Sequence, residues 1–183
     1  MSQLITTYRG LLARLDRTAP VVLPTLARLV FSAVTLVYFW RSAVSKLGEG
    51  FWGFLSPSSG GYVQIFPKAM EAASYNTGEL GVFHWAVVVA GTWAEFILPA
   101  LILLGLLTRP AALGMIGFIT VQSLTDLYGH GGIEHAATLG AWFDRLPDGV
   151  IMDQRAFWVL ALLVLVFKGA GPLSLDRFFR NAP

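Results

Sequence analysis

The chain has 183 residues, of which 55% are hydrophobic and 13% are charged, whereas ordinary soluble domains have about 25% charged residues. This composition suits lipid better than water, and a formal net charge of +2 gives no reason to expect a nucleic-acid partner. Because the chain has no cysteine, a disulfide framework, a thiol nucleophile and an iron–sulfur cluster on this chain are excluded.

Residues 1–20 predict an amphipathic helix that lies in the lipid headgroup layer. They lack the compact apolar core and small-residue cleavage site of a signal peptide. The alternative is a frayed, soluble tail. The apolar positions that recur at helical spacing are Leu4, Ile5, Tyr8, Leu11, Leu12 and Leu15, and Arg9, Arg14 and Arg17 fall largely elsewhere around the helix.

Four apolar segments then predict membrane-spanning helices, because about 20 mostly apolar residues cross a bilayer. The expected spans are residues 21–46, 83–107, 111–128 and 154–170. A short turn at 108–110 makes the second and third spans antiparallel neighbours. The predicted fold is therefore an all-α membrane protein: a single domain, with an up-down bundle of four transmembrane helices after the N-terminal amphipathic helix.

Two long connections join these spans, at residues 48–82 and 129–153. The first should hold a short helix over 67–75, because proline is favoured in the first turn of a helix. Seven lysines and arginines flank the spans on the N-terminal side of the membrane and five on the other side. This bias predicts that both termini are cytoplasmic and both long connections are on the outer face.

Glu95 lies in the middle of the second span, where an ionised side chain costs about 3 kcal/mol or more. At 1.5 Å per residue, Glu95 is about 20 Å from the inner boundary, Gln122 about 16 Å and Asp126 about 22 Å. Arg41, at the outer end of the first span, can reach towards the same layer. We therefore expect these four side chains to gather in the outer half of the bundle.

This layer has two interpretations. A buried Glu–Arg pair can simply hold helices together. Alternatively, Glu95 and Arg41 form a proton-linked site, in which the carboxylate accepts the proton of a quinol hydroxyl supplied from the membrane. The candidate ligand-binding residues around that pair are Lys46, Tyr38, Trp93, Gln122 and Asp126.

Other polar residues give weaker signals. His130 and His135 are candidates for a metal site, but their spacing does not match the i, i+4 zinc pattern and two glycines intervene. Arg28, inside the first span, is expected to have a structural role, either towards lipid phosphates or towards a neighbouring helix. Small residues that permit close helix packing, within one chain or in a homo-oligomer, are Gly91, Ala94, Gly105, Gly114 and Gly117.

Three segments resemble the DoxX family of small four-helix bacterial inner-membrane proteins. They are FWRSAVSKL at the end of the first span, AEFILPALILLGLLTRPAALGM across the second and third, and KGAGPLSLDR after the fourth. The family's basic pair matches Arg41 and Lys46, and Arg28 matches the arginine of its first helix. The remaining matches are Glu95 and Pro99, then Gly105, Thr108 and Arg109, then Lys168, Gly169, Gly171, Ser174, Leu175 and Asp176. One departure is Ala43, which stands where the family has glycine.

The resemblance implies a bacterial cytoplasmic membrane protein that is accessory to redox chemistry, as a subunit of a quinone-linked oxidoreductase assembly. Its partners would be the lipid membrane and the other proteins of a redox or maturation complex. The alternative is a membrane anchor or small transporter for a metal-handling or peptide-maturation system. A loop metal site is a third possibility.

Overall fold

The computed structural model describes residues 2–180, and within this range the chain forms helices and no strand. Four helical stretches in this range are long and apolar enough to cross a membrane, which confirms the prediction of an all-helical chain with four such segments. They are α1 (Ser2–Lys46), α4 (Val82–Leu104), α5 (Thr108–Leu124) continued by the π-helical turn η2 (Thr125–Gly129), and the π-helical turn η4 (Val150–Arg155) continued by α7 (Ala156–Lys168).

Short helices fill the connections. Between α1 and α4 lie α2 (Ser59–Ile65), α3 (Pro67–Ala72) and η1 (Thr77–Glu79); between η2 and η4 lie η3 (Gly132–Glu134) and α6 (Ala136–Leu139); α8 (Leu175–Arg180) follows α7. The helix α3 begins at Pro67 as expected but ends before residue 75. The reason is that Ser74 and Tyr75 have positive φ angles of 49° and 61°, which a right-handed helix does not permit.

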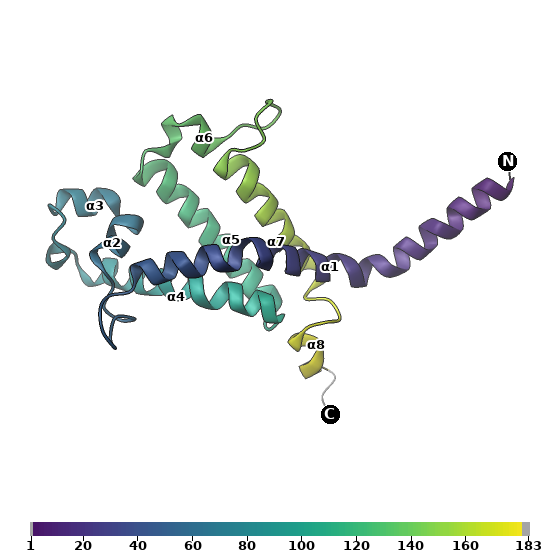
Figure 1. Cartoon of the computed structure of the whole chain (residues 1–183), viewed down its shortest axis with the longest axis horizontal. Helices are drawn as coiled ribbons and strands as arrows, with labels where there is room; N and C mark the ends of the chain where they lie inside the picture. The colour runs from purple at the N-terminus through teal and green to yellow at the C-terminus, as the bar shows by residue number, and fades with distance from the viewer. Residues whose placement is uncertain (1, 181–183) are drawn as a thin grey trace.

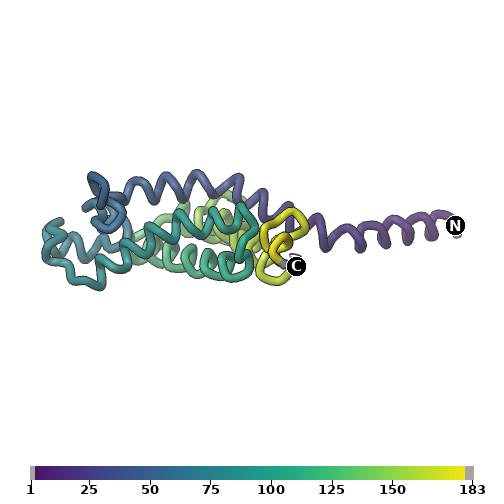
Figure 2. Tube along the Cα trace, turned by 90° about the horizontal axis from the view of Figure 1, so that it is seen from below, coloured from purple at the N-terminus to yellow at the C-terminus, as the bar shows by residue number. Residues whose placement is uncertain are grey.

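Helix α1 is one continuous helix, with Pro20 and Pro24 inside it, so the segment 2–20 is helical but not separate from the first span. None of residues 3–23 is buried, and this part projects well beyond the other helices (Figures 1 and 2). From Pro24 onward, buried positions recur every three or four residues, as on one face of a helix. They are Pro24, Arg28, Phe31, Ser32, Thr35, Phe39, Ala43 and Lys46.

The four long stretches pack in a ring, in which α1 and α5 each contact both α4 and α7. Figure 1 shows α2 and α3 at one end of the ring and α8 towards the other. We call these the α2 end and the α8 end. Apolar side chains from all four stretches fill the middle and the α8 end. The buried members of this core are Phe31, Phe39, Ile102, Ala111, Ala112, Met115, Ile119, Trp158, Leu162 and Leu165.

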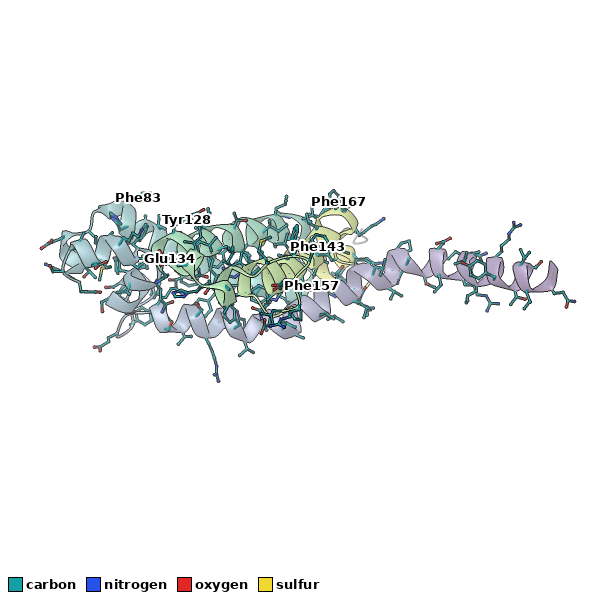
Figure 3. All side chains as sticks on the ribbon, turned by 90° about the horizontal axis from the view of Figure 1, so that it is seen from above. Phe83, Tyr128, Glu134, Phe143, Phe157 and Phe167 are labelled. Carbon is teal, nitrogen blue, oxygen red and sulfur yellow. The ribbon has the colours of Figure 1, made fainter. Side chains whose placement is uncertain are left out.

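The outside of the ring is apolar. Only 22–28% of the most apolar window of each long stretch is buried. Phe83, Phe157 and Phe167, which are spread along the ring in Figure 3, are 69%, 71% and 73% exposed. Apolar area of this extent is costly in water and suits lipid tails. The described part of the chain therefore has the surface of a multi-pass membrane protein.

At the α8 end, backbone groups and two charged side chains tie the C-terminal segment to the turn between α4 and α5. Asp176 accepts hydrogen bonds from the N–H groups of Leu107 (2.7 Å) and Thr108 (2.9 Å), and its own N–H donates to the carbonyl of Gly105 (2.8 Å). The Arg28 guanidinium donates to the carbonyls of Leu103 and Leu173. We call Arg28, Gly105 and Asp176, with these partners, the C-terminal clasp.

The clasp shifts the ionisation of Asp176. Burial favours the neutral acid, but the hydrogen bonds from Thr108 and Leu107 and the positive charge of Arg28 favour the carboxylate more. The pKa of Asp176 is therefore lowered below its ordinary value. Arg28 thus has the structural role expected for it, bridging α1 to the end of α4 and to the C-terminal segment.

Candidate functional site

Glu95 faces the interior of the ring because it falls on the buried side of α4. The buried residues of this helix are spaced by three and four positions, at Val88, Thr92, Glu95, Pro99 and Ile102. The carboxylate takes a position that the pattern otherwise gives to uncharged side chains, and only 3% of Glu95 is exposed. Since proline has no N–H, position 99 donates no hydrogen bond to the carbonyl of Glu95.

The partner of Glu95 is Lys46, the last residue of α1, which is 4% exposed. Its Nζ lies 2.9 Å from Glu95 Oε2 and 3.1 Å from Oε1. The same Nζ donates to Ser42 Oγ (2.6 Å) and to the Ser42 carbonyl (3.0 Å), and Ser42 Oγ donates to Glu95 Oε1 (3.0 Å). These three residues form a closed network, the buried triad, in which both charges are neutralised away from water.

The buried triad lies on the wall of a cavity of about 560 Å³ between α1, α4 and α5, which reaches α2 and the end of η2. A volume of roughly 300–1,000 Å³ is typical of sites for small molecules. Most of the wall is apolar or small, and the polar groups come from α1, α2, α4, α5, η2 and the residue that follows η2. The lining residues are Tyr38, Ser42, Lys46, Gln64, Ile65, Val87, Ala90, Gly91, Ala94, Glu95, Leu98, Gly114, Gly117, Phe118, Val121, Gln122, Thr125, Asp126 and His130.

Tyr38 and Gln122 form a second polar contact on this wall. Gln122 Nε2 donates to the Tyr38 hydroxyl (3.0 Å), which leaves the hydroxyl hydrogen free to donate. Gln122 Oε1 is buried and has no hydrogen-bond partner among the described residues. A buried acceptor without a donor costs about 1–3 kcal/mol, so a donor that reached it from the cavity would be favoured.

Asp126 faces the cavity from η2 and pairs with a residue that sequence reasoning did not single out. Arg155 Nη2 lies 2.5 Å from Asp126 Oδ2, and Arg155 Nη1 donates to Ser123 Oγ at 2.9 Å. The arginine side chain is 5% exposed and the aspartate 32%. Each partner sits in a π-helical turn, η2 or η4, a distortion that is frequent at functional sites.

The histidines do not assemble a metal site. His130 lines the cavity at its α2 end, where Nε2 lies 3.0 Å from the Gln64 carbonyl. His135 is exposed and does not line the cavity. Within residues 2–180, no group of three or more histidine, cysteine, aspartate or glutamate side chains could hold a metal ion.

Two predicted site residues lie elsewhere. Arg41 is exposed and does not line the cavity, because one residue step turns a helix by about 100° and Ser42 and Lys46 define the inward face. The expected gathering around Glu95 therefore includes Lys46 in place of Arg41. Trp93 is 39% exposed, also outside the cavity lining, and its ring packs against Phe54 and Phe96.

Ser42 and Arg155 are the polar partners of Glu95 and Asp126 that the sequence reasoning missed, and Gln64 and Thr125 of the cavity wall were missed as well. Ser42 precedes Lys46 by four positions, a spacing that puts both on one helix face, and this signal was available. Arg155 stands directly before the apolar run of the fourth span. Nothing in the local sequence distinguishes it from the lysines and arginines that commonly flank membrane spans.

Comparisons of the chain with protein-family models, with curated proteins and with solved structures find no match. The chemistry of the site therefore rests on its own residues: a cavity with a mostly apolar wall, a neutralised carboxylate–ammonium pair, and an amide–phenol pair with an unfilled acceptor. A mostly apolar wall with a few polar groups is the kind of lining that cavities for small molecules have.

Proposed function

We propose that this protein binds a quinone from the bilayer in the cavity and serves as an accessory subunit of a quinone-linked oxidoreductase assembly. The observation that carries the proposal is the pair of Lys46 and Glu95, 4% and 3% exposed, on the wall of a cavity between apolar helices. An ionisable group at membrane depth is a functional-site hypothesis by default. The resemblance to the DoxX family supports the same class of protein.

The proposed membrane placement is an up-down bundle in a bacterial inner membrane, with both termini cytoplasmic and the α2 end outside. The distribution of lysine and arginine supports it. At 1.5 Å per residue the 45-residue α1 is about 68 Å long, more than twice the hydrocarbon thickness of about 30 Å. We propose that α1 bends near Pro20 and Pro24 in the membrane, so that the segment before the bend lies in the headgroup layer.

The cavity residues fit a quinone head. The Tyr38 hydroxyl can donate to a ring carbonyl oxygen, and Gln122 Oε1 can accept from a ring hydroxyl. Glu95, held by Lys46 and Ser42, can take up the proton that a quinol hydroxyl releases on oxidation, and the Lys46 ammonium can then balance the negative charge left on the ring oxygen. The bound quinol would supply the electrons and a partner subunit would accept them, since this chain offers no thiol.

The test is Glu95→Gln, which keeps the size of the side chain and its hydrogen bonds but removes the ionisable carboxyl. The assembly is captured from native membranes through a tag on this protein, and its quinone-dependent activity is measured. We expect a loss of about 100-fold or more, as is typical when a general acid–base group is removed. The matched control is Glu49→Gln, at an exposed carboxylate beyond α1, which should retain full activity.

Activity equal to wild type in correctly inserted Glu95→Gln would show that the buried triad only braces α1 against α4. One observation favours the alternative function as a membrane anchor or small transporter: Phe51 and Trp52, in the loop after α1, are 83% and 65% exposed. If the protein is an anchor, exchange of loop 48–82 should abolish partner capture while Glu95→Gln is tolerated.

A further inference from the structure

The cavity opens through the side of the ring, between α4 and α5. On α5 its wall is formed by Gly114, Gly117 and Val121, which lie on one helical face, and all three are exposed; Val121 is 59% exposed. On α4 the facing positions include Gly91 and Ala94. Small residues on both sides leave a slot that starts at the apolar outer surface and leads inward to the buried triad.

The two glycines of α5 are not equivalent. A Cβ at Gly114 would lie 3.2 Å from Leu98 Cδ2, so this position is filled by a helix–helix contact. A Cβ at Gly117 would meet nothing within 4 Å. The open volume of the slot is therefore at Gly117, five residues before Gln122.

The slot does not continue through the protein. Ile102, Met115 and Leu162, all 0% exposed, fill the ring between the cavity and the α8 end. The C-terminal clasp closes that end with backbone and side-chain hydrogen bonds. A molecule that enters through the side can lodge its head near Tyr38 and Gln122, but it has no route to the α8 end.

We infer that this slot holds one alkyl or isoprenoid chain of a membrane amphiphile, whose hydrogen-bonding head reaches Tyr38 and Gln122 inside the cavity. An amphiphile fits better than a second copy of the chain, because the volume extends past the α5 surface to Ser42 and Lys46 of α1, where a packed helix cannot reach. Two sources share this chemistry, a membrane quinone and a single acyl chain of a lipid. The choice of a quinone as the bound amphiphile rests on the proposed function, whereas the inference that the slot holds an amphiphile does not.

The experiment measures what the protein retains when it is purified from native membranes in mild detergent, with quinone and phospholipid per chain quantified by mass spectrometry. Gly117→Leu fills the slot and should reduce the bound amphiphile at least 10-fold. The control is Gly10→Leu, because Gly10 is also helical with nothing within 4 Å of a Cβ but lies outside the ring. Gln122→Leu should weaken retention by removing the head contact.

A second variant keeps the test valid if Gly117→Leu does not fold. Because the chain has no cysteine, Gly117→Cys can be alkylated after purification with an N-alkyl maleimide, and the reaction rate reports access to the slot. Added decyl-ubiquinone should slow that alkylation at least 10-fold, and alkylated protein should no longer bind decyl-ubiquinone.

The outcomes separate the two proposals. Quinone retained by wild type and lost from Gly117→Leu supports both. Phospholipid retained and lost in the same way, with no quinone, supports the slot and removes the quinone function. Three results would overturn the inference that the slot holds an amphiphile. The first is wild-type protein without bound amphiphile, and the second is unchanged retention in Gly117→Leu. The third is a shift from dimer to monomer as the sole effect of that variant.

Discussion

Arg28 at the α8 end and Lys46 at the α2 end are both buried cations, but the surrounding groups neutralise their charges differently. At the α8 end, Arg28 donates to two backbone carbonyls and lies near the carboxylate of Asp176. At the α2 end, Lys46 is held by a carboxylate and a serine. The α8 end is closed by packed side chains, whereas the α2 end encloses a cavity.

This difference fits the proposal that the α8 end holds segments of the chain together and that the α2 end binds a ligand. The flat guanidinium of arginine matches several fixed acceptors at once, which suits a clasp between three segments. The ammonium of lysine is a compact point charge without this fork, and the charged partner of Lys46 is Glu95. Removing Lys46 from its pair with Glu95 at the α2 end should therefore lower the free energy of unfolding most. Changes in the C-terminal clasp should lower it less.

The largest expected effect is that of Lys46→Met, which leaves Glu95 buried with only the Ser42 hydroxyl as partner. Removing one member of a buried ion pair typically costs about 3–5 kcal/mol, while replacing both by apolar residues is often neutral. We expect a loss of that size in SDS titrations followed by circular dichroism, and recovery of most of it in Lys46→Met with Glu95→Leu. Lys68→Met, at an exposed lysine of α3, is the control. Equal stability of the single and double variants would contradict the pairing.

The second effect compares two glycines, one at each end. At Gly105, φ is +65° and a Cβ would lie 2.6 Å from Ser174 Cβ. Gly105→Ala should therefore lower the free energy of unfolding by about 1–2 kcal/mol because of the left-handed backbone. It should lower it further because the C-terminal segment at Ser174 is displaced. At Gly117, Gly117→Ala should be neutral or stabilise by up to about 1 kcal/mol, because alanine favours helix and the space is open. The same SDS titrations measure both. If the two variants lost equal stability, the contrast between a packed and an open end would be wrong.

The sequence predicted those features that depend on local composition and spacing. The four apolar stretches and the burial of Glu95 follow from runs and periods that one chain segment carries by itself. The start of α3 at Pro67 follows from the backbone preference of proline.

The pairing of charges could not be predicted in the same way. Arg41 and Lys46 both stand at the end of the first span, and only the rotation of α1 against α4 decides which one meets Glu95. Arg155 meets Asp126 after two π-helical turns, each of which shifts the helix face by about one residue relative to a regular 3.6-residue period. Such rotations result from packing between distant segments, which sequence periodicity does not report.

The smallest expected effect concerns Asp176 and depends on pH. Asp176→Asn removes the negative charge that accepts hydrogen bonds from the N–H groups of Leu107 and Thr108 at the start of α5, which should cost about 0.3–1 kcal/mol at neutral pH. Because folding lowers the pKa of Asp176, its carboxylate stabilises the folded state above the ordinary aspartate pKa of about 4.

That stabilisation is lost as the pH falls through the lowered pKa, so the stability difference between wild type and Asp176→Asn should shrink towards zero in acid. Taking this difference in parallel SDS titrations cancels the other carboxylates that titrate in the same range. Asp148→Asn, at an exposed aspartate in the connection before η4, should show no such trend. A difference that stays constant with pH would mean that the C-terminal clasp holds through Arg28 and the Gly105 backbone alone, with no contribution from the charge of Asp176.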